Sequence, residues 1–365
     1  MIFKILPIPA VVRSSIAQGR KGITLVGRSL TAQGLRRLLG ALVLAVAFPS
    51  WAQQAHPALS LPIADAHFHF MLFMTPPELL ERMERHNIRW TISAGAIGAP
   101  SQGNPIARDR LASEHLGARF IPAAGGFEAR GAELRMGTRF YTDEPNAERE
   151  DVLRKTQDQM SMQPRVFSET FPNAESSSED PVRRRRVDTN GPYFRALMAI
   201  GIREGRPVPM HMQFNPESVT QLSQLLTDHP GGQVLLSHCG KDTQAAQVRV
   251  MMDKHPNLYC DLSYRGAPLA TNESQRDPRR LIFWGPGPLV SAGMKSDWRQ
   301  LIEDHPDRFM VGIDDVHTWA IYDEMVAAIR QGVLAQLTPA TAEKVAWRNA
   351  VRLFRLPEAA QGTSK

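Results

Sequence analysis

Two histidines, His67 and His69, are spaced so that both can bind one metal ion. They lie in the segment Ile63-Ala64-Asp65-Ala66-His67-Phe68-His69, which is apolar enough to form a buried strand. Residues two apart in a strand point to the same face, and at a rise of about 3.3 Å per residue their Cβ atoms are roughly 6.6 Å apart. Imidazole nitrogens leaning inward from that spacing can both reach an ion at about 2.0–2.1 Å. An HxH pair alone is weak evidence, because two histidines in a strand are more often structural.

Four further polar residues fall at or near the ends of other apolar runs. They are Glu169 after Val166-Phe167-Ser168, His211 within Pro209-Met210-His211-Met212, His238 after Val234-Leu235-Leu236-Ser237, and Asp314 after Met310-Val311-Gly312-Ile313. A polar side chain at the tip of a buried strand is costly unless it has a partner. If the tips meet, four imidazoles and two carboxylates share one place, and we interpret this set as a metal site.

The elements that would bring these residues together alternate between strand and helix. Eight short apolar runs predict strands at 61–68, 89–94, 119–124, 165–169, 207–212, 233–238, 257–262 and 308–314. Helical patterns lie between them, for example at 77–86, 193–204, 216–228, 244–254 and 323–331. Most of the runs lack clean alternation, which is typical of parallel strands buried on both faces.

Eight strands alternating with helices predict an α/β fold, a (β/α)₈ TIM barrel in which the strand ends converge on one mouth. A doubly wound sheet is the alternative, but no GxGxxG turn follows the first strand. Residues 126–163 and 171–192 are longer than ordinary connections, so we expect insertions after strands three and four. Three histidines that precede proline are expected to end helices away from the site, namely His229, His255 and His305.

The ordered set of strand-end residues resembles the amidohydrolase superfamily, and within it the amidohydrolase-related family of metal-dependent hydrolases and decarboxylases. The resemblance spans roughly residues 61–356, including Asp65–His69, Ser237–Gly240 and Gly312–Asp314. It implies that His67, His69 and Asp314 bind a first divalent metal ion, for which we expect zinc. His211 would complete a one-ion site or would join His238 on a second ion, and Glu169 matches a strand-four carboxylate found in some relatives.

The chemistry implied by the resemblance is hydrolysis of an ester, lactone, amide or similar bond of a small molecule by metal-activated water. Asp314 would take the proton of that water and return it to the leaving group. His238, if it is not a ligand, would hydrogen-bond the substrate oxygen. Asp65 either orients a ligand or makes an ordinary strand-end hydrogen bond. Two alternatives stay open: a decarboxylase that uses the same site, and a periplasmic barrel that binds a ligand without turnover.

The charge distribution argues against a nucleic-acid partner. The net charge is +6, but residues 1–52 hold seven basic residues and no acidic ones, which leaves 36 basic against 37 acidic residues in the rest of the chain. A small molecule is the expected partner. The run Arg183–Arg186 either binds an anionic substrate or is a solvated loop, and Tyr264-Arg265 and His317 are further candidates for substrate contact.

Residues 1–52 are predicted to be a cleaved signal peptide. Arg36-Arg37 precede the apolar run Leu38–Phe48, and Ser50-Trp51-Ala52 offers small residues at the cleavage positions. Because the run is too short to span a bilayer, we expect no stable membrane anchor after cleavage, although an anchor is the alternative. The expected product is a periplasmic protein, exported by the Sec or twin-arginine route, with a single domain at 57–357. Cys239 and Cys260 are expected to be buried free thiols rather than a disulfide.

Overall fold

The computed structural model describes residues 56–95, 105–162, 166–174, 186–267 and 280–356. The predicted signal peptide at 1–52 and the residues 183–185 lie outside these ranges. Within them, no helix combines the length and the apolar character that a membrane crossing requires.

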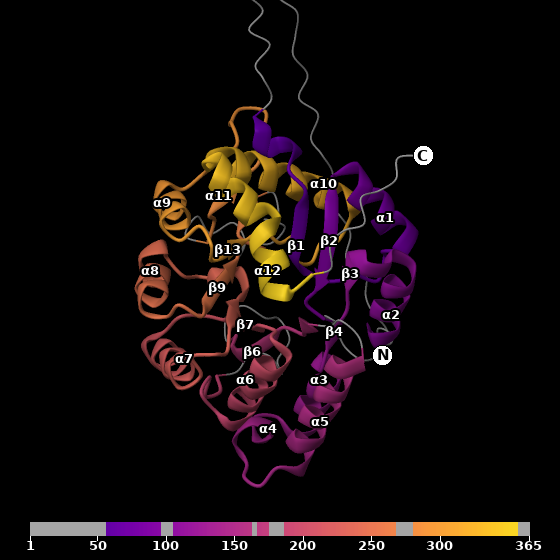
Figure 1. Ribbon diagram of the computed structural model, residues 1–365, viewed down its shortest axis with the longest axis vertical. Helices are drawn as coiled ribbons and strands as arrows, with labels where there is room; N and C mark the ends of the chain where they lie inside the picture. Colours follow the sequence, from indigo (N-terminus) through magenta and orange to yellow (C-terminus); the bar gives the residue numbers. More distant parts are fainter. Residues whose placement is uncertain (1–55, 96–104, 163–165, 175–185, 268–279, 357–365) are drawn as a thin grey trace, which may run out of the picture. The chain divides into compact units, whose positions relative to one another are not determined.

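Eight strand positions follow one another along the chain (Figure 1). They are β1 (Ile63–Phe68), β2 (Ile88–Ser93), β3 (Phe120–Ile121) with β4 (Ala123–Ala124), β5 (Val166–Phe167) with β6 (Thr170–Asn173), β7 (Val208–Met212), β8 (Val234–Leu236), β9 (Leu258–Asp261) and β13 (Phe309–Met310). Every residue of β1, β7 and β8 is buried, as expected for strands that have helices outside and side chains inside.

Parallel pairing connects β1, β2 and β3, then β4 and β5, and then β6, β7, β8, β9 and β13 in that order. The strands β13 and β1 share no extended ladder. The Ala66 amide nevertheless donates to Val311 O at 3.0 Å, and the Asp314 amide donates to His67 O at 2.7 Å. Each of the eight positions therefore has a bonded neighbour on both sides, and the predicted (β/α)₈ fold is confirmed.

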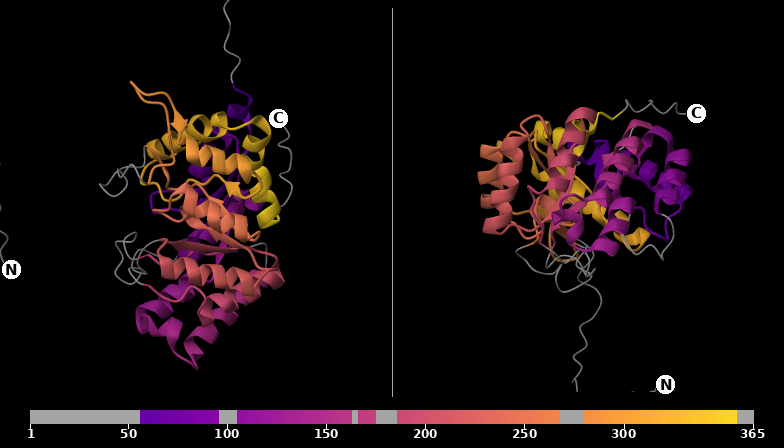
Figure 2. Two further views of the ribbon diagram at one scale, coloured as in Figure 1. Left: turned by 90° about the vertical axis from the view of Figure 1, so that its left-hand side faces the viewer. Right: turned by 90° about the horizontal axis from the view of Figure 1, so that it is seen from below.

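Helices cover the outer side of these strands, as the three views together show (Figures 1 and 2). The α-helices are α1 (Pro76–Arg85), α2 (Pro105–Leu116), α3 (Gly126–Met136), α4 (Arg139–Thr142), α5 (Ala147–Met162), α6 (Pro192–Glu204), α7 (Pro216–Asp228), α8 (Ala245–Lys254), α9 (Ser296–Asp304), α10 (Trp319–Ala328), α11 (Pro339–Glu343) and α12 (Asn349–Phe354). Thus the expected insertion after strand three consists of α3, α4 and α5.

Shorter elements complete the described chain. The 3₁₀ helices are η1 (Pro57–Ser60), η3 (Gly117–Arg119), η4 (Ser237–Cys239) and η6 (Leu334–Gln336), and the π-helical segments are η5 (Ile329–Val333) and η7 (Lys344–Arg348). A small separate sheet contains β10 (Gly266–Ala267), β11 (Phe283–Trp284) and β12 (Gly293–Met294).

The fourth strand position differs from the prediction in a way that matters for the site. The chain was expected to leave the barrel at Glu169, but strand structure resumes at Thr170 and continues to Asn173. At the break, the backbone amide of Ser168 donates to Ala124 O and that of Glu169 donates to Ala94 O, whereas Thr170 pairs with β7. Glu169 therefore lies where the strand changes partner, and the expected second insertion begins later than residue 171.

The three histidines that precede proline cap helices, as predicted. His229, His255 and His305 are the C-cap residues of α7, α8 and α9. Beside the first of them, the buried side-chain amide of Asn257 donates to the carbonyl oxygens of Leu226 (3.1 Å), His229 (3.1 Å) and Gly232 (2.8 Å). These bonds satisfy the carbonyl groups that the end of α7 leaves open.

Asn257→Ala tests the importance of this side-chain amide. Because the change leaves buried carbonyl groups without donors, we expect the free energy of unfolding to fall by about 2–3 kcal/mol. Denaturant titration measures this, with Gln224→Ala as control, since Gln224 is exposed and bonds only Asp228 on the surface of α7. The control should change stability by about 0.5 kcal/mol or less. Equal stability of the two variants would contradict the interpretation.

Candidate metal centre

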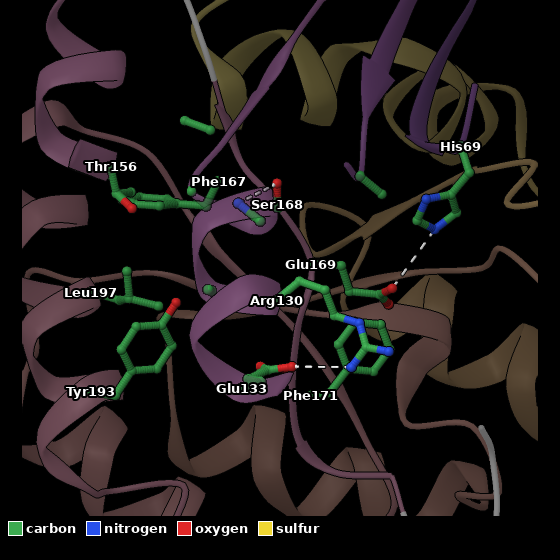
Figure 3. Close-up of a pocket in the computed structure, with 15 residues that line it drawn as sticks. His69, Arg130, Glu133, Thr156, Phe167, Ser168, Glu169, Phe171, Tyr193 and Leu197 are labelled. Atoms are coloured by element: carbon green, nitrogen blue, oxygen red, sulfur yellow. Dashed lines mark hydrogen bonds and ion pairs between the residues drawn. The ribbon is translucent and has the colours of Figure 1, made fainter. Parts of the chain in front are cut away.

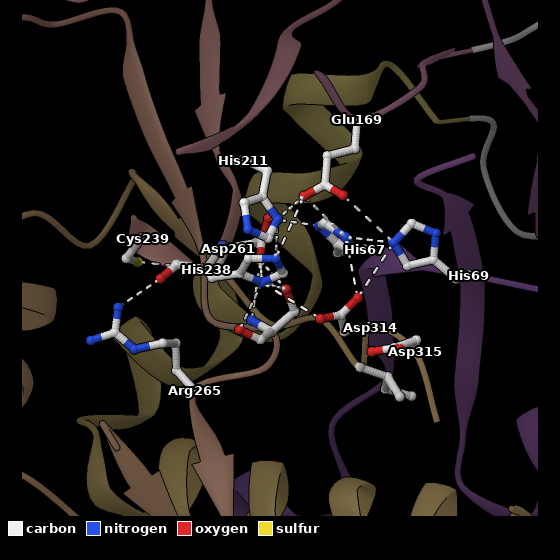
Figure 4. Close-up of polar contacts among 12 residues, drawn as sticks. His67, His69, Glu169, His211, His238, Cys239, Asp261, Arg265, Asp314 and Asp315 are labelled. Atoms are coloured by element: carbon white, nitrogen blue, oxygen red, sulfur yellow. Dashed lines mark hydrogen bonds and ion pairs between the residues drawn. The ribbon is translucent and has the colours of Figure 1, made fainter. Parts of the chain in front are cut away.

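All six residues predicted to form a metal site lie together at the carboxyl end of the strands (Figure 4). They are His67 on β1, His69 just after it, Glu169 between β5 and β6, His211 on β7, His238 in η4, and Asp314 after β13. Each of them is buried, with between 1% and 8% of the residue surface exposed. The convergence follows from the fold, because the strand ends of a parallel barrel meet at one mouth.

Three overlapping groups of potential ligands lie here, one of which is His67, His238 and Asp261. His67, His69 and Asp314 form the group that is called the first group below. The Nε2 atoms of His67 and His69 are 3.2 Å apart. Asp314 Oδ1 lies 3.5 Å from His67 Nε2 and 3.4 Å from His69 Nε2. Four ligands bonded tetrahedrally to one zinc ion at about 2.05 Å are about 3.3 Å from one another. The three atoms therefore have the spacing of ligands to a single ion.

Glu169, His211 and His238 form the second group. His211 Nδ1 lies 3.2 Å from both Glu169 Oε1 and His238 Nε2, and these last two atoms are 3.5 Å apart. Glu169 also reaches the first group, since its Oε2 lies 3.7 Å from His69 Nε2. Its position at the break in the fourth strand thus places one carboxylate between the two groups.

The hydrogen bonds on the outer side of the rings determine which nitrogens face the centre. Nδ1 of His69 donates to Gly95 O at 2.7 Å, and Nδ1 of His67 donates to Asp261 Oδ2 at 3.2 Å, because these oxygens can only accept. In the neutral rings both Nε2 atoms therefore present lone pairs to each other, with carboxylate oxygens beside them. A cluster that contains acceptors and few hydrogens fits a bound cation, so the donor set is suited to a metal ion.

The electrostatics of the cluster agree with this picture. Burial opposes a charge on His67, but the carboxylates of Asp261, Glu169 and Asp314 outweigh burial and raise the pKa of His67 to about 10. Burial also opposes the ionised form of Glu169, yet the neighbouring histidines hold its pKa well below the ordinary value. Burial raises the pKa of Asp314 to about 7 and lowers that of His211 to about 4. The carboxylates thus favour one positive charge among these rings.

Asp261 at the end of β9 is a site residue that the sequence analysis did not single out. Besides holding His67 through Oδ2, it accepts from the backbone amide of His238 at 3.1 Å through Oδ1. Asp65, which was considered for the orienting role, bonds the backbone amides of His67 and Ile313 and makes no hydrogen bond to an imidazole. The sequence signal that could have revealed Asp261 is its position, since it is an acidic residue at the end of a predicted strand, like Glu169 and Asp314.

A buried arginine holds the turn that carries His238. His238 and Cys239 have φ angles of 58° and 50°, in the left-handed region that disfavours side chains with a Cβ. The Arg265 guanidinium is buried and donates to the carbonyl oxygens of His238 (2.9 Å), Gly240 (2.7 Å) and Thr243 (2.9 Å). Arg265, considered above as a substrate contact, therefore bonds the backbone that positions a ligand.

The remaining candidates occupy less central places. His317 is largely exposed and lies 4.0 Å from Asp315, which is not part of either group. Arg186, the described member of the arginine run, pairs with Glu217 at 3.1 Å. The Tyr264 ring lies 5.6 Å from the His238 ring. Both cysteines are buried and not joined by a disulfide.

Comparison with known proteins identifies the family. Residues 176–356 match the family model described as Amidohydrolase, and the chain belongs to this family. The matched segment includes His211, His238, Asp261 and Asp314, while the ligand candidates that precede residue 176 lie outside it. No curated protein sequence matches the chain significantly.

One solved structure supports the fold, and two others are similar to this chain. An amidohydrolase from Burkholderia multivorans with bound HEPES is 16% identical, has a TM-score of 0.50, and covers 81% of this chain and 100% of its own. A dihydroxybenzoic acid decarboxylase from Polaromonas sp. JS666, with bound manganese and the inhibitor 2-nitroresorcinol, is 14% identical with a TM-score of 0.48 and covers 81% of this chain and 97% of its own. A probable 2-pyrone-4,6-dicarboxylic acid hydrolase from Acinetobacter baumannii with bound citric acid is 12% identical with a TM-score of 0.47 and covers 81% of this chain and 100% of its own.

Asp261→Asn tests whether this carboxylate orients His67. An amide nitrogen facing His67 Nδ1 would move the ring hydrogen to Nε2, where it would point into the centre. We expect zinc affinity to fall about 10- to 100-fold, as measured by competition with a chromophoric chelator. Asp304→Asn is the matched control, because Asp304 pairs with Arg249 on the surface at 2.8 Å. Unchanged affinity in Asp261→Asn would refute the orienting role.

Proposed function

We propose that the protein is a metal-dependent hydrolase that cleaves an ester, lactone, amide or similar bond of a small molecule. The observation that carries this proposal is the pair of imidazole Nε2 atoms 3.2 Å apart with Asp314 beside them. Membership of the amidohydrolase family, whose relatives include hydrolases and decarboxylases, is consistent with it. The proposed location is the periplasm, which rests on the signal-like sequence of residues 1–52.

We assign the metal ligands to the two groups described above. His67, His69 and Asp314 would hold one divalent ion, with zinc as the expected metal. His211 and His238 would hold a second ion together with Glu169, whose two oxygens face different groups. The bonds of His238 Nδ1 to Ser263 leave its Nε2 directed at Glu169 and His211, which favours a ligand role over contact with the substrate.

A divalent ion held by these residues would supply Lewis acidity, which would make an attacking water molecule more acidic. The chain's own part is to move the proton. Asp314 Oδ1 faces the two histidines, whereas Oδ2 points toward His238 at 3.8 Å from Nδ1. Asp314 would accept the proton of the attacking water and deliver it to the leaving group. Burial excludes bulk water from the reacting groups.

The metal content of the full chain tests the ligand assignment. Protein purified without chelators should contain one or two equivalents of a transition metal, and His67→Ala/His69→Ala should lose it, as mass spectrometry of the elements would show. His305→Ala is the control, because His305 caps α9 and pairs with Asp253 at 3.0 Å. If the double variant keeps its metal, or if the wild type cannot bind any on reconstitution, the assignment is wrong.

The type of reaction is tested by following the oxygen of water into the product and by measuring the release of CO₂. On a substrate found by screening esters, lactones, amides and carboxylic acids, turnover in ¹⁸O-water should place the label in the product. Asp314→Asn should lower kcat by a factor of about 100 or more, because the proton acceptor is lost. Release of CO₂ without incorporation of ¹⁸O would instead show a decarboxylase and would refute the hydrolase proposal.

A further inference from the structure

The carboxyl end of β2 contributes none of the six clustered ligands, yet it bonds to the strands that carry both ligand groups. Ala94 and Gly95 follow β2 directly. The Ala94 amide donates to Phe68 O at 2.9 Å, next to His69, and Ala94 O accepts from the Glu169 amide at 2.8 Å. This short segment therefore joins the end of β1, with its ligands of the first group, to the break in the fourth strand.

The carbonyl group of Gly95 is the acceptor that directs the His69 ring. Nδ1 of His69 donates to Gly95 O at 2.7 Å, which leaves Nε2 facing His67. Gly95 has a φ of 93°, and a Cβ on this residue would lie 2.5 Å from Ser168 Oγ. His69, Ser168 and Glu169 line a cavity together with residues of α3 and α5 (Figure 3). The absence of a side chain at Gly95 thus lets its backbone approach His69 and Ser168 at once.

A buried hydroxyl group in β2 holds the Gly95 amide. Ser93 is 1% exposed. Its Oγ accepts from the Gly95 amide at 3.1 Å and donates its own hydrogen to Asp109 Oδ2 at 2.7 Å. A hydroxyl has one hydrogen to donate, and a carboxylate can only accept. Asp109 therefore fixes the direction of the Ser93 hydroxyl, whose lone pairs are left for Gly95.

Asp109 connects this arrangement to the outer layer of helices. The residue lies on α2 and is buried. Besides the Ser93 hydroxyl, its Oδ2 accepts from the Ala123 amide of β4 at 3.2 Å. A series of hydrogen bonds thus runs from Asp109 through Ser93 and Gly95 to His69. Every hydrogen in this series points toward Asp109, and the Nε2 lone pair of His69 points the other way, into the centre.

We propose that Ser93, Gly95 and Asp109 are positioning residues of the metal centre, which hold the Gly95 carbonyl group so that His69 presents Nε2 to a divalent ion. The inference rests on the proposed function, because it takes His69 as a ligand. An outer hydrogen bond fixes the tautomer and the orientation of a ligating histidine. Here the acceptor is a backbone carbonyl group, so its direction depends on the side chains that hold the backbone. Loss of the Ser93 hydroxyl should therefore weaken metal binding, although two hydrogen bonds separate it from the ring.

Ser93→Ala tests the middle of this series, and Thr91→Val is the matched control on the same strand. Thr91 is buried in β2, and within the described part of the chain its hydroxyl makes no hydrogen bond. Both variants remove one buried hydroxyl, but only Ser93→Ala releases the Gly95 amide. Competition of the full chain with a chromophoric chelator should show zinc affinity about tenfold lower in Ser93→Ala and unchanged in Thr91→Val.

A spectrum of the bound metal gives a second measurement. The d–d absorption of the cobalt-loaded protein should change in Ser93→Ala, because the His69 ring is held differently, and should match the wild type in Thr91→Val. Denaturant titration of the metal-free proteins shows whether each variant is folded. Ser93→Cys replaces Ser93→Ala if the latter does not fold, since a thiol of similar shape is only a weak acceptor.

The outcomes separate a positioning role from a structural one. If Ser93→Ala lowers stability while zinc affinity and the cobalt spectrum stay those of the wild type, the proposal is overturned. An equal loss of affinity in Thr91→Val would also overturn it, because any hydroxyl lost from β2 would then have the same effect. Failure of the wild type to bind zinc or cobalt would instead overturn the metal-centre proposal, and this inference with it.

Discussion

Two imidazole nitrogens face each other at 3.2 Å in the centre of the site, and in the neutral rings neither of them carries a hydrogen. The hydrogens of His67 and His69 are used on the outer side of the rings, by Asp261 and by the carbonyl group of Gly95. Burial keeps water from relieving the crowding of lone pairs, and the nearby carboxylates add further acceptors. A cation satisfies all of these groups at once. The surrounding fold therefore has to keep each outer hydrogen bond intact, because loss of one reverses the polarity of a ring.

The supporting structure shows how this is done. Asp261 bonds the His67 ring and the His238 backbone, so one carboxylate positions a residue of β1 and a residue of η4. Arg265 bonds three carbonyl groups of the turn that contains His238. Left-handed backbone conformations cost of order 1 kcal/mol or more, and these buried hydrogen bonds offset that cost. Asp314, with a φ of 75°, is held in the same way by its amide bond to His67 O.

Much of the fold and of the site was predictable from local patterns. The apolar runs identified all eight strand positions, and polar residues at their ends identified the six residues that the structure brings together. The sequence analysis does not single out Asp261, because the strand predicted at 257–262 is identified by its apolar residues alone. The same rule that selected Glu169 and Asp314 applies to it.

Other features depend on contacts that no local pattern contains. The break in the fourth strand arises because Glu169 bonds Ala94 while Thr170 bonds β7, and a partner change between two distant strands leaves no trace in the apolar spacing. The left-handed turn at His238 depends on Arg265, which lies 27 residues further along the chain. The series of hydrogen bonds from Asp109 to His69 joins α2 to the ends of β2 and β1, so no single stretch of the sequence contains it.

The segment from α3 to α5 contributes none of the six clustered ligands, although it forms one wall of the cavity beside them. Under the proposed function, the residues that would bind the metal and the residues of this wall thus lie in separate stretches of the chain. Under the same proposal, changes within Gly126–Met162 would reshape this wall while the ligand set stays the same, so that one insertion could vary independently of the metal centre. The same separation makes the segment the natural part to randomise when a different substrate is wanted.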